Sequence, residues 1–269
     1  MKTLYVIIIF LGSLHLSLGQ SIKSDKRISN DSVHIDLINP FYVPMELRLS
    51  ALDSTKDYTD IVPYYLLKEK DTLKNAIVLP IKKVNDTSSI NIKKYINFKA
   101  SFGNPKSSID YNYEYSLPYP KGKKYKIIQS FGGKFSHNMK HSKYAIDFGT
   151  QIGDTITAIR PGIVFFVKED SNEHCRTRRC VNKANKIMIL HNDGSIASYV
   201  HLDVNGVLVN EGDEILEGQP IGISGFTGFT TKPHLHLVIY KSGSESIPFY
   251  FKGQKQRKLK QGKSYKRNI

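Results

Sequence analysis

The stretch KPHLHLVIY, residues 232–240, carries two histidines two positions apart at the start of an apolar run. Side chains alternate between the two faces of a strand, so His234 and His236 point the same way, and Leu235, Leu237 and Ile239 point the other way. Two residues of strand rise about 6.6 Å. One imidazole can therefore bind a metal ion while its neighbour touches a ligand of that ion. The alternative from this stretch alone is a pair of exposed histidines on an edge strand.

Short alternating runs continue along the chain on both sides of this stretch, and clusters of Gly, Pro, Asn and Asp separate them. This spacing predicts an all-β protein. The clearest hairpin is NKIMILHNDGSIASYVHL, residues 185–202, where two alternating runs flank NDG. Glycine tolerates the positive φ that such a tight turn requires. No stretch shows a convincing amphipathic helix or an internal repeat.

The amino-acid composition of the chain changes near residue 120. Seven of the nine histidines lie after residue 130, and a Pro- and Lys-rich segment precedes them. Before it, short strands with frequent turn residues favour a small β-sandwich-like domain. We therefore predict a signal peptide at 1–20, an N-terminal β-rich domain at 21–115, a linker at 116–124, an antiparallel β-sheet domain at 125–250 and a basic flexible tail at 251–269.

The N-terminus has the pattern of a secretory signal peptide. Lys2 provides the positive start, LYVIIIFLGSLHLSLG (4–19) is the apolar core, and Ser17 and Gly19 supply small residues near a cleavage point. An uncleaved anchor is the alternative, but a bilayer span needs about 20 apolar residues and His15 interrupts this run. We expect an exported protein, periplasmic or extracellular, that does not span the membrane after cleavage.

The two cysteines, Cys175 and Cys180, are expected to form a disulfide because an exported chain meets an oxidising compartment. Their use as metal ligands is the alternative, although this spacing with only His174 nearby is a weak metal signal. The formal net charge of +15 suits an anionic polymer such as cell wall, outer-membrane lipid or nucleic acid. Nucleic acid is not the expected partner, because no stacking-aromatic and arginine pattern of a known binding module is present.

The C-terminal half contains the residue types of a zinc hydrolase. Such sites need about three protein ligands, an open position for water and a nearby group that takes the proton of the water. The candidate segments are FSHNMKHSKYAIDFG (135–149), SYVHL (198–202) and PHLH (233–236). Each is weak alone. Together they place histidines at the ends of separate strands, which a folded sheet can bring together.

In this order the segments resemble the M23 (LytM/lysostaphin-like) zinc metallopeptidases. The resemblance covers about residues 125–242 and includes YAIDFG, GDTITAIRPGIV, ANKIMILHNDGSIASYVHL, VNEGDEILEGQPIGISGFTG and PHLHLVIY. It implies a LytM-like antiparallel sheet and Zn²⁺ bound by His137, Asp147 and His236. It also implies that His201 and His234 are the catalytic pair, and it leaves open which of the two is the base.

One position departs from the family pattern. In many members the first histidine ligand lies four residues before the aspartate, and Lys143 occupies that position here. A protonated lysine is a poor zinc ligand. Two upstream histidines compete for the role, and we favour His137, which ends the phrase GGKFSH, over His141.

The resemblance implies hydrolysis of peptide cross-links in bacterial peptidoglycan by a zinc endopeptidase. The bond can be a D-alanyl-diamino acid cross-link or one in a glycine-rich bridge, and the sequence does not decide between them. The alternative is a catalytically inactive LytM-like protein that binds the wall or activates another hydrolase. Inactive members usually lose metal or catalytic residues, and this chain keeps all five.

Overall fold

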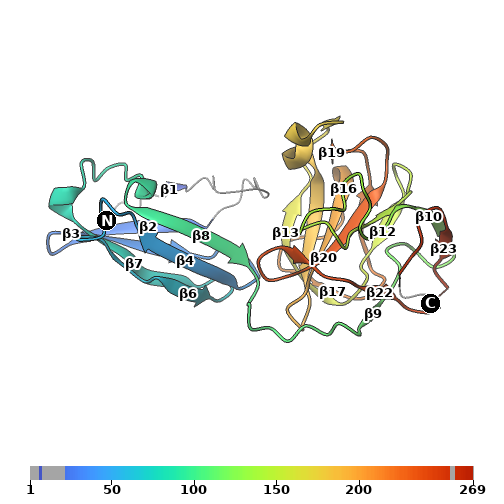
Figure 1. Ribbon diagram of the computed structural model, residues 1–269, viewed down its shortest axis with the longest axis horizontal. Helices are drawn as coiled ribbons and strands as arrows, with labels where there is room; N and C mark the ends of the chain where they lie inside the picture. The colour runs from blue at the N-terminus through green and yellow to red at the C-terminus, as the bar shows by residue number, and fades with distance from the viewer. Residues whose placement is uncertain (1–5, 8–21, 255–257, 269) are drawn as a thin grey trace. The chain divides into compact units, whose positions relative to one another are not determined.

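The computed structural model describes residues 6–7, 22–254 and 258–268, and the chain forms two compact units, 1–104 and 105–269 (Figure 1). Apart from Val6–Ile7, the predicted signal peptide lies outside the described residues. No helix in the described part of the chain has the length and apolar character needed to cross a membrane. Each unit is described separately below.

The first unit consists of two antiparallel sheets, which confirms the all-β, sandwich-like prediction. One has the strand order β1-β2-β3-β7-β5 and the other β6-β4-β8. Alternation explains the strands, because Val33, Ile35 and Leu37 of β3 are buried on one face. The elements are β1 (Val6–Ile7), β2 (Lys23–Ser29), β3 (Ser32–Ile38), β4 (Met45–Ala51), β5 (Asp60–Ile61), β6 (Tyr64–Leu67), β7 (Thr72–Pro80), β8 (Ile96–Phe102) and the short 3₁₀ turns η1 (Ile81–Lys83) and η2 (Ile92–Lys94).

The second unit is built on an 11-stranded sheet whose main order is β17-β13-β15-β16-β20-β11-β10-β23 (Figure 1). Its strand pairs are antiparallel, as predicted, and two small separate pairs, β14 with β19 and β9 with β22, are parallel. The elements are β9 (Glu114–Tyr115), β10 (Lys124–Gln129), β11 (Ile146–Phe148), β12 (Thr155–Thr157), β13 (Gly162–Lys168), β14 (His174–Cys175), η3 (Arg178–Lys183), β15 (Asn185–Leu190), β16 (Ile196–Val207), β17 (Glu214–Ile215), β18 (Pro220–Ser224), β19 (Gly228–Phe229), β20 (Leu235–Lys241), β21 (Glu245–Ser246), β22 (Tyr250–Phe251) and β23 (Ser264–Lys266).

The core of this unit lies against one face of the sheet. Leu235, Leu237 and Ile239 of β20 point into it and are fully buried, as the alternation in 232–240 predicts. The opposite face carries His236, which pairs directly with Asp147 of β11. Directly paired residues of antiparallel strands lie on the same face. The register therefore puts these two polar side chains together.

The predicted hairpin forms from β15 and β16, with the turn at NDG between them. Gly194 in this turn has a φ of +84°, which only glycine adopts without strain. The pairing places Lys186 opposite Val200, and Val200 lies opposite His236 on the next strand. The hairpin thus extends the face that carries His236 by two further strands.

The described residues of the C-terminal segment form part of the second unit. The structure therefore does not have the flexible tail predicted at 251–269. β23 pairs with β10, and Leu259 and Arg267 are buried. Backbone pairing and the buried Arg267 hold this segment in place, although its sequence has no apolar periodicity. The Arg267 guanidinium donates to the Tyr119 carbonyl at 2.9 Å and to Thr157 Oγ1 at 3.0 Å.

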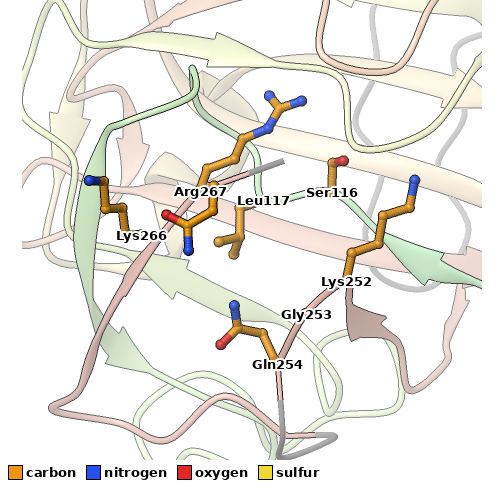
Figure 2. A pocket seen from close by; sticks show the side chains of 8 residues that line it. Ser116, Leu117, Lys252, Gly253, Gln254, Lys266 and Arg267 are labelled. Carbon is orange, nitrogen blue, oxygen red and sulfur yellow. The ribbon is translucent and has the colours of Figure 1, made fainter.

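A cavity of about 150 Å³ lies where this segment meets residues 116–117 (Figure 2). Two of the cations that line it have protein partners: Arg267 makes the contacts given above, and the Lys252 ammonium lies 2.8 Å from Glu217, which also accepts from the Ser116 hydroxyl at 2.6 Å. Residues 115–119 are buried, so the predicted linker at 116–124 begins inside the second unit rather than outside it. These contacts fix the C-terminal segment, and none of them involves the histidines of the PHLH segment.

His191 is buried at the turn of the hairpin, with 2% of its surface exposed. Its Nδ1 lies 2.8 Å from the Pro161 carbonyl and donates to it, while its Nε2 has no hydrogen-bond partner in the described part of the chain. Burial lowers the pKa of His191 to about 4, and the Arg160 charge acts in the same direction, against Asp193. The buried position of His191 is therefore compatible only with its neutral form.

We expect the protein to lose stability as the pH falls from about 6.5 to 4. In this window an unfolded histidine binds a proton and buried His191 does not, so protonation favours unfolding. The difference between the two pKa values corresponds to a loss on the order of 3 kcal/mol. Urea unfolding from pH 8 to 4.5 measures it. His191→Asn keeps a donor for the Pro161 carbonyl and does not titrate, so its stability should change less over this window. An equal change in both proteins would contradict the assignment.

Candidate metal centre

Three of the predicted site residues meet at one end of the histidine-bearing sheet face. Asp147 lies on β11 and His236 on β20, while His137 comes from the turn segment that joins β10 to β11. The His137 Nε2, Asp147 and the His236 Nδ1 are the candidate ligand atoms, all within 4.8 Å of one another. His137 and Asp147 are buried and His236 is partly exposed. We call these three residues the ligand cluster.

The spacing of the ligand cluster fits a metal ion. Asp147 Oδ1 lies 3.2 Å from His137 Nε2 and 2.8 Å from His236 Nδ1, and the two nitrogens are 3.3 Å apart. Tetrahedral zinc with bonds of about 2.0–2.1 Å separates its ligand atoms by about 3.3 Å. The observed distances are close to that value, and two imidazoles with a carboxylate are a donor set that zinc accepts.

Neighbouring groups orient the ligands of this cluster. His137 Nδ1 lies 3.0 Å from the Ser130 carbonyl, which fixes the ring so that Nε2 faces Asp147. The other oxygen of Asp147 accepts from the Gln129 side-chain amide at 3.3 Å. Metal-binding histidines commonly donate their second ring nitrogen to a carbonyl in this way. Sequence reasoning missed Gln129 and Ser130, because a carbonyl and an amide near a strand end carry no motif.

His201 and His234 lie beside the ligand cluster, with ring centroids 4.6 Å apart. The Nδ1 of His201 is 2.6 Å from the Thr227 carbonyl, and that of His234 is 2.9 Å from the Lys232 carbonyl. A carbonyl only accepts, so each Nδ1 carries a proton and each Nε2 is left as a proton acceptor. His234 Nε2 lies 3.7 Å from Asp147 Oδ1 and therefore faces the cluster.

The backbone at His201 is unusual, with a φ of +70° inside strand β16. Non-glycine residues in this region cost about 1–3 kcal/mol and occur where the surrounding structure imposes them. Here the imposing contact is Gly225, whose N–H donates to the His201 carbonyl at 3.0 Å. A Cβ on Gly225 would lie 2.4 Å from the Asp203 backbone, so only glycine allows this approach. The loop that follows β18 thus orients His201.

The charges of the site depend on one another. Burial alone would raise the pKa of Asp147, but the His234 charge and hydrogen bonds from His137 and His236 lower it well below the usual range. Burial lowers the pKa of His201 well below its usual value, and electrostatic interaction with His234 and His236 lowers it further. The result is an ionised carboxylate with a neutral His201, which suits a cation bound by the cluster.

The loop between β18 and β20 is fastened to the disulfide segment. Cys175 and Cys180 are joined by a disulfide, and β14, which contains Cys175, pairs with β19. The same loop supplies the carbonyls that hold His201 and His234. The disulfide segment therefore borders the site without supplying a ligand to it.

The competing residues of the first-ligand position lie outside the ligand cluster. His141 is half-buried and Lys143 is exposed. Among the described residues, the set of groups that could hold a metal ion contains His137 and not His141. The structure thus groups His137 with Asp147 and His236. It also places His201 and His234 next to this ligand cluster.

The fold and this arrangement of side chains define a β-sheet domain with a candidate metal centre lined by histidine and aspartate. Residues 141–248 match the model of Peptidase family M23. The match begins four residues after His137, so it includes Asp147 and the histidines of β16 and β20 but not the first candidate ligand.

Several proteins of known name are similar to the C-terminal half. An uncharacterized metalloprotease of Buchnera aphidicola is 33% identical over 127 residues, which are 46% of this chain and 31% of that protein. The peptidoglycan DD-endopeptidase ShyA of Vibrio cholerae is 29% identical over 128 residues, 46% of this chain and 27% of its own length. The murein hydrolase activator NlpD of Salmonella dublin is 29% identical over 130 residues, 48% and 30% of the two chains. The chain thus spans less than a third of each relative.

Among solved structures, the catalytic domain of lysostaphin from Staphylococcus simulans is 29% identical. The similarity covers 46% of this chain and 86% of that domain, with a TM-score of 0.34.

Proposed function

We propose that the protein is an exported zinc endopeptidase that hydrolyses peptide cross-links of bacterial peptidoglycan. The observation that carries the proposal is the convergence of three candidate ligands with two further imidazoles whose Nδ1 atoms are both held by carbonyls. The M23 match and the peptidoglycan endopeptidase among the relatives support the substrate class. The net charge of +15 also suits an anionic wall polymer.

In this proposal His137, Asp147 and His236 hold the zinc ion, and His201 and His234 act on the reacting atoms. When bound, zinc supplies a Lewis acid that polarises a scissile carbonyl and makes water more acidic. One Nε2 of the histidine pair accepts the proton of the attacking water. The other imidazole takes a proton from solvent at its Nε2 before the reaction and donates a hydrogen bond from it to the developing oxyanion. The carbonyls of Thr227 and Lys232 keep both rings in the required orientation.

The second candidate is a non-catalytic wall-binding protein or hydrolase activator, which the similarity to NlpD favours. An inactive member needs neither a complete ligand cluster nor an oriented histidine pair. The presence of all five side chains in one place argues for the enzyme.

Digestion of purified cell-wall sacculi by the mature protein, residues 21–269, tests the proposed function. We expect cross-linked muropeptides to disappear with zinc and to persist with a chelator. The products identify the bond, a D-alanyl-diamino acid cross-link or a glycine bridge. Zinc binding without any cleavage would favour the activator, and the absence of both zinc binding and cleavage would overturn the enzyme assignment.

A further inference from the structure

A row of directly paired residues crosses the sheet from the ligand cluster to two lysines. Asp147 of β11 pairs with His236 of β20, His236 with Val200 of β16, Val200 with Lys186 of β15, and Lys186 with Lys168 of β13. Direct partners share a face, so all five side chains lie on the face that carries the candidate site. We call this set the cross-sheet row.

The distance along this row suits an extended peptide. Neighbouring strands are about 4.8 Å apart, so Lys186 lies about 10 Å from His236 in the backbone. An extended peptide covers this distance in about three residues. A substrate whose scissile bond lies at the ligand cluster can therefore place a side group at Lys186.

The two lysines of the row differ in their partners. Lys168 forms an ion pair with Asp170. Lys186 has no acidic partner in the described part of the chain, and its ammonium lies 5.7 Å from the centre of the Phe166 ring. Its side chain is partly buried. Lys186 is thus a cation on the site face whose charge is not neutralised by the protein.

The surroundings of Lys186 strengthen an interaction with an anion. The next row of the same face pairs Phe166 with Met188, and both side chains are buried. An apolar floor lowers the local dielectric and increases the energy of a charge pair. Burial, with a smaller effect of Lys168, lowers the pKa of Lys186 to about 8. That direction is typical of an ammonium without an anionic neighbour.

We propose that Lys186 is a specificity-determining residue that binds a carboxylate of the substrate peptide about three residues from the scissile bond. The inference rests on the proposed function and adds the chemical class of substrate group that this face of the sheet binds. A peptide carries free carboxylates at its C-terminus and on acidic side chains, and each of these groups can be converted to a carboxamide. A lysine at this position distinguishes the two, because only the carboxylate forms a charge-assisted hydrogen bond with the ammonium.

The experiment measures binding separately from cleavage. In a His234→Ala background, calorimetry compares a cross-linked muropeptide dimer with free carboxylates and the same dimer with its carboxylates converted to carboxamides. We expect the free-acid dimer to bind more tightly, and Lys186→Met to raise its Kd about tenfold with less than about a twofold change for the amidated dimer. Lys186→Arg should keep the preference. Lys168→Met is the matched control, and it should leave both Kd values within about twofold because Asp170 already pairs with Lys168.

Cleavage assays then separate this inference from the proposed function. With His234 intact, Lys186→Met should raise KM for the free-acid dimer about tenfold and leave kcat within about threefold, as loss of uniform binding requires. Equal weakening for both dimers, no weakening, or no binding of either dimer would overturn the role of Lys186. Lys186-dependent binding of the free acid without any cleavage by the parent protein would support Lys186 and contradict the endopeptidase.

Discussion

Replacement of His234 by alanine is expected to lower kcat by about 10²- to 10⁴-fold while the bound zinc remains. The ring lies 3.7 Å from Asp147 but outside the ligand cluster, so its loss removes a proton-transfer group and not a ligand. His201 remains held by the Thr227 carbonyl, so a single imidazole is left for the two roles of proton acceptor and oxyanion donor. Release of muropeptides gives kcat, and elemental analysis of the same sample gives the zinc content.

A matched control for this change is His191→Asn, which alters another buried histidine of the same unit outside the ligand cluster. Its kcat at pH 7.5 should stay within about threefold of the parent, since His191 has no part in the site. Loss of zinc from the His234→Ala protein would mean that His234 is a ligand. Unchanged kcat with zinc present would remove His234 from the mechanism.

The strand of His236 and the face that it shares with His234 could be predicted because period-two alternation is a local property of the chain, although β20 begins at Leu235, one residue after His234. Leu235, Leu237 and Ile239 face the core as expected. The two histidines were not on an exposed edge, since β20 lies between β16 and β11. Local pattern was sufficient for the element and its orientation, and the family resemblance added which residues belong together.

Other features depend on register and on backbone groups, which a single sequence does not reveal. The cross-sheet row joins Lys186 to His236 only because three strands align in one register. The carbonyls of Ser130, Thr227 and Lys232 orient the rings, and a carbonyl is present at every residue. The C-terminal segment has a polar sequence without periodicity, yet pairing of β23 with β10 holds it in place. Strand pairing between distant segments and contacts to backbone carbonyls thus account for the points that the sequence did not predict.

The largest loss of metal affinity is expected from His137→Asn. The shorter side chain can still donate to the Ser130 carbonyl, but it has no atom where Nε2 approaches Asp147 and His236. Loss of a group that only orients a ligand costs about 10- to 100-fold in metal affinity, so loss of the ligand itself should cost at least about 100-fold. Competition with a chromogenic chelator measures the zinc Kd, and activity on sacculi should fall with it.

His141→Asn is the matched control, because His141 lies four residues away and outside the ligand cluster. Its zinc Kd should stay within about threefold of the parent. Thermal unfolding provides a second readout: zinc at about 100 times the parent Kd stabilises a binding protein by about 2.7 kcal/mol. The parent and His141→Asn should therefore gain thermal stability with zinc, and His137→Asn should gain little. The reverse result, with zinc lost from His141→Asn and kept by His137→Asn, would assign the first ligand to His141 and require the turn segment between β10 and β11 to rearrange when metal binds.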